Sequence, residues 1–391
     1  MSDSPFFRVL ATSICGLFGV AMAALMTACG DDEGAGVGGA GGVGGSDGTG
    51  GSAAVSGCSA QSLDLCEYPS RGTSFTIRKG LTVTDELTSR ELPIWVRVPE
   101  GAGPHPMVVW SHGGGLAAAG QTQSGWWADA LAAHGYAVLT VAHIPIDATS
   151  GQALCELAQI PQAECAAGAA GEEDTTGLLA LVKTRDIVAV LDALPDLSAS
   201  SVMAGGPAVD LDHVVVGGWS AGARAPLVTH GAVFLPSPSA PPMTMVHTLP
   251  IAAIVLSPMG PGYAGFFDEP GGNTWQSVRG PVLVATGDND VKPEKPDVTG
   301  ADRRIAFERQ PADGTRWLLY SKLEPGVGGH PTYDLEHLDS ADERVRRFSL
   351  SLRSSVLAFL DKHVRNDANA QAWLDSTNAS TLAGAADWVR K

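Results

Sequence analysis

The chain has 391 residues, of which 44% are hydrophobic and 17% charged, and its 42 acidic against 25 basic side chains give a formal net charge of −17. Nucleic acids and anionic membrane surfaces are bound through fields of Lys and Arg, so this charge argues against either as a partner. The length allows one large domain or two ordinary ones. Six cysteines are too few for a disulfide-dense scaffold. Glycine makes up 48 of the 391 residues, which is more than its usual share of roughly 7%.

An apolar, uncharged run occupies residues 9–28 and follows Arg8. Its length would suit a transmembrane helix, but the small residues at its end favour a cleavable export signal. Residues 25–29 (LMTAC), followed by Gly30 and a glycine-rich segment, resemble a bacterial lipoprotein leader. This resemblance implies that residues 1–29 are a leader ending at Cys29, which is lipidated and anchors the chain to a bilayer facing the periplasm or the cell surface. Ordinary secretion and an uncleaved anchor are the alternatives.

Thirteen of the glycines lie in residues 30–57, which contain no aromatic residue and no apolar side chain larger than valine. Such a segment cannot bury enough surface to offset its chain entropy, so we expect a flexible tether with a root-mean-square span of about 30 Å. Its match to the dinucleotide-binding pattern G-x-G-x-x-G is a chance one, because that pattern needs a strand before it and a helix after it.

The number of cysteines is also consistent with export. Loss of Cys15 with the leader leaves four cysteines beyond the lipidation site, and four cysteines allow three disulfide connectivities. Short spacings favour the pairs Cys58–Cys66 and Cys155–Cys165. Buried free thiols are the alternative. A metal site is disfavoured, because neither pair has C-x-x-C spacing or a histidine cluster nearby.

Beyond the tether, short apolar runs alternate with segments of helical periodicity. This alternation predicts an α/β domain over residues 58–391, with a mostly parallel sheet and helices on both faces. Irregular segments interrupt it near residues 144–177, 236–250 and 258–280, and the aromatic side chains of the last either contact substrate or pack back on the domain. We expect strands near residues 92–98, 107–110, 136–141, 214–216, 251–256, 282–285 and 317–320, and helices near residues 126–134, 178–194, from 221 onward and 350–364.

Residues 218–222 read GWSAG and match the pattern G-x-S-x-G. The pattern alone is weak, since the tether contains a second match around Ser46. Ser220, unlike Ser46, follows an apolar strand and precedes a helix-compatible run, which is the setting of a nucleophile elbow. Flanking glycines suit a strained turn in which a Cβ would clash with neighbouring backbone. We therefore predict that Ser220 is a nucleophile.

A serine nucleophile needs a base to take its proton and an acid to orient that base, and in this setting they follow in the order Ser, Asp or Glu, His. A predicted strand ends just before Asp288 and Asp290, of which Asp290 is the preferred acid and Asp288 the alternative. His330 follows two glycines in the loop after a later strand and is the preferred base. His337 is the alternative, and His363 is expected on the surface of the closing helix.

This chemistry also requires two backbone N–H donors for the oxyanion of the tetrahedral intermediate. Ala221, the residue after the nucleophile, would supply one. The glycine run after an early predicted strand would supply the other, and we favour Gly114 over Gly113 and Gly115. His112, which precedes the run, is expected to brace the turn.

A family resemblance is carried by residues 108–113 (VVWSHG), 127–142, 184–192 and the GWSAG turn, and it covers most of residues 74–365. The chain is similar here to the α/β-hydrolase superfamily, and within it to predicted dienelactone hydrolases, platelet-activating-factor acetylhydrolases and polyester hydrolases. The resemblance implies a serine carboxylester hydrolase that acts on a small or polymeric ester without a metal or organic cofactor. Dienelactone hydrolases use cysteine, so the serine favours esterase chemistry. The chain departs from many relatives at Ala223, where they have a second glycine, and in the insertion that carries the second cysteine pair.

Two rival functions remain open. A serine peptidase or amidase could use the same fold, because a triad alone does not choose the leaving group. A non-catalytic surface-binding protein would leave Ser220 unreactive. The leader is neutral and the tether carries four acidic residues, so a charge of −13 belongs to the remaining domain and favours neutral or cationic substrates.

Overall fold

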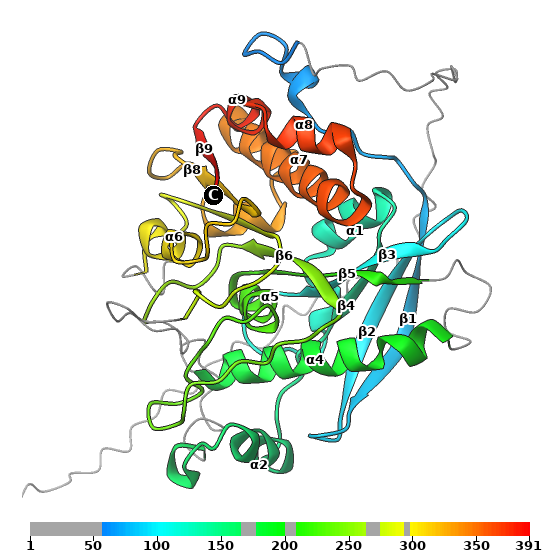
Figure 1. Cartoon of the computed structure of the whole chain (residues 1–391), viewed down its shortest axis with the longest axis vertical. Coiled ribbons are helices and arrows are strands. Elements are labelled where there is room, and N and C mark those ends of the chain that lie inside the picture. Colours follow the sequence, from blue (N-terminus) through cyan, green and yellow to red (C-terminus); the bar gives the residue numbers. More distant parts are fainter. Residues whose placement is uncertain (1–56, 166–176, 200–208, 263–273, 293–297) are drawn as a thin grey trace, which may run out of the picture. The chain divides into compact units, whose positions relative to one another are not determined.

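A computed structural model describes residues 57–165, 177–199, 209–262, 274–292 and 298–391 (Figure 1). The expected leader, its lipidation site Cys29 and the expected tether up to residue 56 lie outside these described residues, as does the chance serine motif around Ser46. Within the described ranges, no helix is both long and apolar enough to cross a membrane.

Nine strands of the described residues join into one sheet. In chain order they are β1 (Phe75–Asp85), β2 (Arg90–Pro99), β3 (His105–Ser111), β4 (Ala137–Val141), β5 (Val209–Trp219), β6 (Pro250–Leu256), β7 (Val282–Gly287), β8 (Arg316–Ser321) and β9 (Ala386–Arg390). Across the sheet their order is β1-β2-β4-β3-β5-β6-β7-β8-β9. The strands from β4 to β8 in this order are mutually parallel, whereas the pairs β1–β2, β2–β4 and β8–β9 are antiparallel. The prediction of a mostly parallel sheet is confirmed.

Helices cover both faces of this sheet, also as predicted (Figure 1). They are α1 (Gly125–Ala133), α2 (Ala148–Leu157), α4 (Gly177–Ala199), α5 (Arg224–Thr229), α6 (Gly300–Glu308), α7 (Glu343–Arg365), α8 (Ala368–Leu374) and α9 (Asn378–Ala383), with short 3-10 turns η1 (Leu63–Cys66), η2 (Gly120–Thr122), η3 (Ser220–Ala223) and η4 (His330–Asp334). Alternate residues of a strand point to opposite faces. Trp110 accordingly packs with α1 and α7, and its neighbour Val109 packs with α4 on the other face.

Both predicted disulfides are present, one between Cys58 and Cys66 and the other between Cys155 and Cys165. The second lies in the predicted insertion near residues 144–177, where it joins α2 to the segment that follows it; residues 166–176 of that insertion lie outside the described part of the chain. Disulfides persist in oxidising compartments, so both bonds suggest an exported protein.

The strands that the sequence pattern missed lie at the two edges of the sheet. Most residues of β1 are exposed or half-buried, and its pairing with β2 shifts register between Arg78 and Leu81, so no regular apolar alternation marks it. The final residues, to which the sequence analysis assigned no role, form β9 along β8. The ring of Trp388 stacks on Trp317 at a centroid distance of 5.0 Å, which fastens this edge to the sheet.

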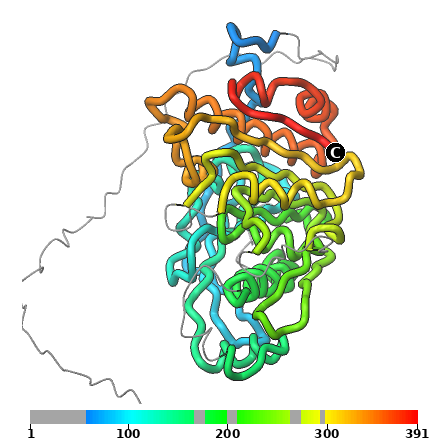
Figure 2. The backbone as a smooth tube through the Cα atoms, turned by 90° about the vertical axis from the view of Figure 1, so that its left-hand side faces the viewer, coloured from blue at the N-terminus to red at the C-terminus, as the bar shows by residue number. Residues whose placement is uncertain are grey.

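A buried carboxylate in α7 ties the first described residues to the C-terminal helices. Figure 2 shows these two parts of the chain, blue and red, beside each other, and Trp373 Nε1 donates to the Cys66 carbonyl at 2.8 Å. Asp361 accepts hydrogen bonds from five side chains, namely Tyr68, Arg71, His134, Tyr136 and Arg365. Burial alone would raise the pKa of Asp361, but His134 and Arg365 outweigh it and hold this pKa well below its usual range.

We predict that Asp361→Asn lowers the free energy of unfolding at pH 7 by about 3–5 kcal/mol, because buried donors lose their charged partner. A depressed carboxyl pKa stabilises the folded state above the unfolded pKa of about 3.9, and this stabilisation is lost as the pH falls below it. Urea unfolding at pH 7 and below pH 3 should therefore give a difference between wild type and variant that shrinks in acid.

The exposed Lys322–Asp387 pair supplies the control, since exposed ion pairs contribute about 0–1 kcal/mol. Asp387→Asn should change the unfolding free energy little at either pH. An Asp361→Asn deficit that is equally large in acid would contradict the assignment of Asp361 as an ionised hub.

Candidate active site

Three loops that follow parallel strands meet at one edge of the sheet. Ser220 comes directly after β5, Asp290 follows β7 and His330 follows β8. The Oγ of Ser220 lies 2.7 Å from Nε2 of His330, and Nδ1 of His330 lies 2.7 Å from Oδ1 of Asp290. Parallel strands present their carboxyl ends at the same edge, which is why residues so far apart in sequence meet there. The structure thus brings together the three residues that the sequence singled out.

The GWSAG turn (residues 218–222) is strained and tightly packed. Ser220 has a φ of 54°, in the left-handed region that costs an L-residue roughly 1–2 kcal/mol. A Cβ added to Gly222 would lie 2.1 Å from the carbonyl oxygen of Ser111, and one added to Gly218 would lie 2.4 Å from that of Gly222. Both glycines are therefore required by the packing of the turn against the end of β3.

Asp290 is fully buried, and both of its carboxylate oxygens accept hydrogen bonds. Its Oδ2 accepts from Thr286 at 2.8 Å and its Oδ1 accepts from Ser257 at 2.7 Å. The Nε of Arg303 lies 3.6 Å from Oδ1 and donates to the Asp290 carbonyl oxygen at 2.8 Å. Burial alone would raise the pKa of Asp290, but Arg303 and the hydrogen bonds from His330 and Ser257 lower it below its ordinary value. The carboxyl group is therefore ionised at neutral pH.

Ser257 is a member of this site that the sequence analysis missed. It follows β6, has a φ of 50° and is fully buried. Its Oγ lies 2.9 Å from Nδ1 of His330 while it donates to Asp290, so its oxygen can accept from the Nδ1–H. We assign that tautomer from the hydrogen-bond network, and it leaves the lone pair of Nε2 facing Ser220. The available signal was its place at the end of an apolar run next to the strand that leads to Asp290.

The alternative acid and base have other surroundings. Asp288 is exposed and accepts a hydrogen bond from Tyr320 at 2.7 Å. The contacts to Ser220 and Asp290 come from His330, and His337 lies beyond η4. The expectation of a surface position for His363 is wrong in part, because this ring is half-buried and packs on Phe359 at 4.7 Å. That side of α7 is partly covered by the domain.

The predicted oxyanion donors lie on the two turns that pack together. Ala221 is the second residue of η3, and the first N–H groups of a helix have no intrahelical acceptor. Gly114 lies in the glycine loop (residues 112–115) and has a φ of 67°, which favours glycine. A Cβ on Gly113 would lie 2.4 Å from the ring of Trp219, whose centroid is 5.2 Å from that of His330. Glycine at this position therefore lets Trp219 pack between the loop and the histidine.

His112 braces the glycine loop, as expected from its position. Its Nδ1 lies 2.6 Å from the carbonyl oxygen of Gly113, and its Nε2 lies 3.5 Å from the backbone nitrogen of His143. Burial and the nearby Lys183 lower the pKa of His112 to about 3, so the ring is neutral. A neutral ring that accepts at Nε2 carries its proton on Nδ1 and donates it to Gly113.

The aromatic segment near residues 258–280 is divided. Residues 263–273, with Tyr263, Phe266 and Phe267, lie outside the described part of the chain. Trp275 is fully buried in a hydrophobic cluster with residues of β6, β7 and β8. Of the two expectations for the aromatic side chains, packing against the domain is therefore the correct one for Trp275.

The described residues contain no group of three or more His, Cys, Asp or Glu side chains with the arrangement of a metal site. No protein-family model matches the chain, and no curated protein is significantly similar to it in sequence. The case for a function therefore rests on the geometry of the site.

We predict that Ser220→Gly is more stable than Ser220→Ala by about 1 kcal/mol, because only glycine adopts a left-handed φ without strain. Both variants lose the hydroxyl, so urea unfolding of the pair isolates the backbone term. The same order is expected at Ser257. Ser111 is the control, since it is buried in an extended strand, where alanine should be the more stable by about 0.5–1 kcal/mol. If the alanine variant were the more stable one at Ser220 as well as at Ser111, the turn would not be strained.

Proposed function

We propose that the chain is a serine carboxylester hydrolase of the α/β-hydrolase superfamily, with Ser220 as its nucleophile. One observation carries the proposal, namely the continuous line of hydrogen bonds from Ser220 through His330 to Asp290. These residues follow parallel strands in the chain order Ser, Asp, His, which is the order of the superfamily. The left-handed serine between a strand and a helical turn also has the form of a nucleophile elbow.

In the proposed acylation, Oγ of Ser220 bonds to the ester carbonyl carbon while its proton passes to Nε2 of His330. The carbonyl oxygen becomes an oxyanion, to which the amides of Ala221 and Gly114 would donate; loss of one such donor typically costs about 2.7–4 kcal/mol of transition-state stabilisation. Collapse of the intermediate breaks the bond to the alkoxide, which leaves as the alcohol with the proton from His330.

Deacylation repeats these steps with water. His330 takes a proton from water as the hydroxide bonds to the acyl carbon, and the returning proton restores the Ser220 hydroxyl when the carboxylic acid leaves. Asp290 stabilises the imidazolium in both steps and holds the ring orientation. Ser257 adds a second acceptor for the same Nδ1–H. The acid side of the site is therefore built to keep one tautomer.

We further infer that the enzyme works outside the cytoplasm, held at a bilayer by a lipid on Cys29. The lipoprotein-type leader supports this proposal, and two disulfides are consistent with an oxidising compartment. The glycine-rich segment would give the domain about 30 Å of reach from its anchor.

We predict that a fluorophosphonate labels Ser220 covalently and that the purified chain hydrolyses p-nitrophenyl esters. Asp290→Asn should lower kcat by roughly 10⁴-fold, because the amide favours the wrong histidine tautomer. Labelling is checked by mass spectrometry of the modified peptide and turnover by steady-state kinetics. Ser46→Ala, in the second G-x-S-x-G match, is the control and should change neither.

A folded chain that is neither labelled nor active on esters would refute this function. Release of amines from peptides at rates well above ester turnover would instead assign the site to an amidase or peptidase. A chain-length series of p-nitrophenyl esters, run beside a polyester, then identifies the acyl group.

We predict that Cys29→Ser moves the protein from the membrane fraction to the soluble exported fraction and abolishes incorporation of labelled fatty acid. Ester turnover by the variant should be unchanged, because the anchor is separate from the site. Cys15→Ser is the matched control and should leave the protein in membranes. Retention of Cys29→Ser in the membrane fraction would favour an uncleaved anchor.

A further inference from the structure

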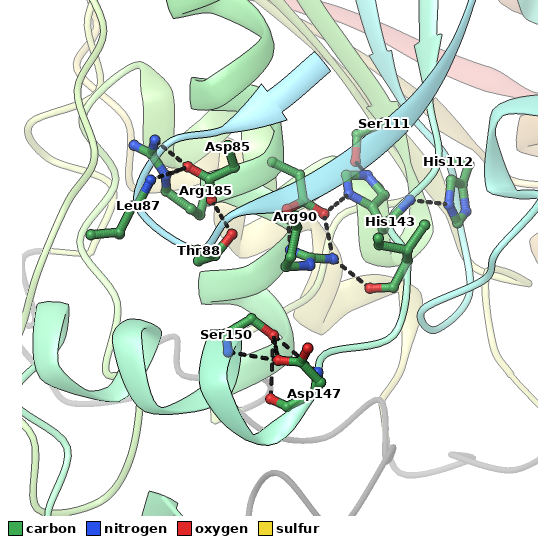
Figure 3. Close-up of polar contacts among 12 residues, drawn as sticks. Asp85, Leu87, Thr88, Arg90, Ser111, His112, His143, Asp147, Ser150 and Arg185 are labelled. Atoms are coloured by element: carbon green, nitrogen blue, oxygen red, sulfur yellow. Dashed lines mark hydrogen bonds and ion pairs between the residues drawn. The ribbon is translucent and has the colours of Figure 1, made fainter. Parts of the chain in front are cut away.

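A second serine–histidine–aspartate arrangement lies next to the glycine loop (Figure 3). The Oγ of Ser111 is 2.8 Å from Nε2 of His143, and Nδ1 of His143 is 3.0 Å from Oδ2 of Asp186. Arg90 donates to Oδ1 of Asp186 at 2.5 Å and also to the carbonyl oxygen of Ile144. The side chains of Arg90, Ser111, His143 and Asp186 are called the buried network below.

The buried network has no access to substrate. Ser111, His143 and Asp186 each have 0% of their surface exposed, and Arg90 has 5%. Ser111 is also the last residue of β3, where it lies between its partner residues on β4 and β5. Serine, histidine and carboxylate are thus all enclosed, and any contribution of the network to catalysis passes through the groups that it holds.

The protons of the network have one consistent arrangement. Burial, together with Lys183, lowers the pKa of His143 well below its ordinary value, so the ring is neutral. Its Nδ1–H then donates to Asp186, and its Nε2 accepts from the Ser111 hydroxyl. Burial raises the pKa of Asp186 to about 7, and the positive charges of Arg90 and Lys183 oppose this rise. The hydrogen bonds therefore form one chain, from Ser111 through His143 and Asp186 to Arg90.

The helix that carries Asp186 also reaches the glycine loop. Lys183, one turn earlier in α4, donates from Nζ to the carbonyl oxygen of His112 at 2.9 Å. His112 in turn donates to the carbonyl oxygen of Gly113. A trans peptide is planar, with its C=O and N–H on opposite sides, so a fixed Gly113 carbonyl also fixes the direction of the Gly114 N–H.

The backbone carbonyls of Ser111 and His112 face the GWSAG turn. A Cβ on Gly222 would lie 2.1 Å from the carbonyl oxygen of Ser111 and 2.5 Å from that of His112. The network holds the side chain of Ser111, and Lys183 holds the carbonyl of His112. The spacing between the glycine loop and the turn is thereby set by buried hydrogen bonds to Lys183 of α4 and to His143, two residues after β4.

We propose that the buried network positions the glycine loop against the GWSAG turn, so that the amides of Gly114 and Ala221 converge on one oxyanion. The inference rests on the proposed function and adds to it the part of the fold that aligns the oxyanion donors. The network touches no substrate, so its members are positioning residues. Their loss should weaken binding of the transition state and spare binding of the ground state.

The test uses Asp186→Asn and Ser111→Ala in the full chain. Asp186→Asn should lower kcat by roughly 10- to 100-fold, because small displacements of a catalytic array cost that much, while KM stays within about threefold. An alkyl trifluoromethyl ketone, which forms an oxyanion-bearing adduct with Ser220, should bind more weakly by the same factor as kcat falls. The matching methyl ketone, which forms no stable adduct, should bind as it does to wild type.

Asp85→Asn is the matched control. Asp85 is fully buried and accepts hydrogen bonds from Thr88 and from Arg185, the residue before Asp186 in α4. Figure 3 shows Asp85 and Arg185 on the left, away from His143 on the right. Like Asp186→Asn, this variant replaces a buried carboxylate that accepts a hydrogen bond from an arginine. We expect a lower melting temperature with kcat and ketone affinity within about twofold of wild type.

Wild-type ketone affinity and kcat in folded Asp186→Asn would overturn the inference, as would an equal loss in Asp85→Asn. If Asp186→Asn does not fold, Ser111→Ala decides, since it removes a single hydroxyl; a parallel fall in kcat and ketone affinity supports the network and no fall overturns it. Wild-type protein that neither hydrolyses esters nor binds the ketone overturns the proposed function, and the inference with it.

Discussion

The packing of the GWSAG turn onto the end of β3 is the contact on which the rest of the site depends. Ser111 and Gly218 are register partners on neighbouring parallel strands, so the two strand ends arrive at the same height. Gly222 then lies directly on the Ser111 carbonyl oxygen, without room for a Cβ. That contact leaves Ser220 in a left-handed conformation, and this conformation brings its Oγ within 2.7 Å of His330. The strain is held by β5, which leads into the turn and is paired with β3 on one side and β6 on the other.

Two Ser–His–Asp arrangements in one chain show how little residue type decides by itself. Both have hydrogen-bond distances of 2.7 to 3.0 Å and the same serine-to-imidazole-to-carboxylate order. Ser111 is an extended strand residue with no exposed surface, whereas Ser220, itself 1% exposed, has a left-handed φ, lies between Gly218 and Gly222, and faces a histidine that is 7% exposed. Backbone conformation and the partial exposure of its histidine distinguish the Ser220 array, so Ser220, and not Ser111, is the proposed nucleophile.

The sequence predicted the central strands well because they are continuous apolar runs, and it located Ser220, Asp290 and His330 because each follows such a run. Ser257 also follows such a run, but the local pattern assigns no role to it or to Arg303. Their roles depend on β6 lying beside β7 and on α6 returning over the acid loop, and neither neighbour relation is written in the local pattern. The edge strands were missed for a related reason, since half-exposed strands have no long apolar run.

The two sides of the site have the same construction. Asp290 is held by Arg303 on the acid side, and Asp186 is held by Arg90 on the side of the glycine loop, with all four side chains buried. Buried ion pairs seldom add net stability, because desolvation offsets most of their attraction. Apolar residues of similar size would stabilise the domain equally well, but they could not accept a hydrogen bond from the Nδ1 atoms of His330 and His143. We therefore infer that these charges are retained for direction, one fixing the tautomer of His330 and the other the ring of His143.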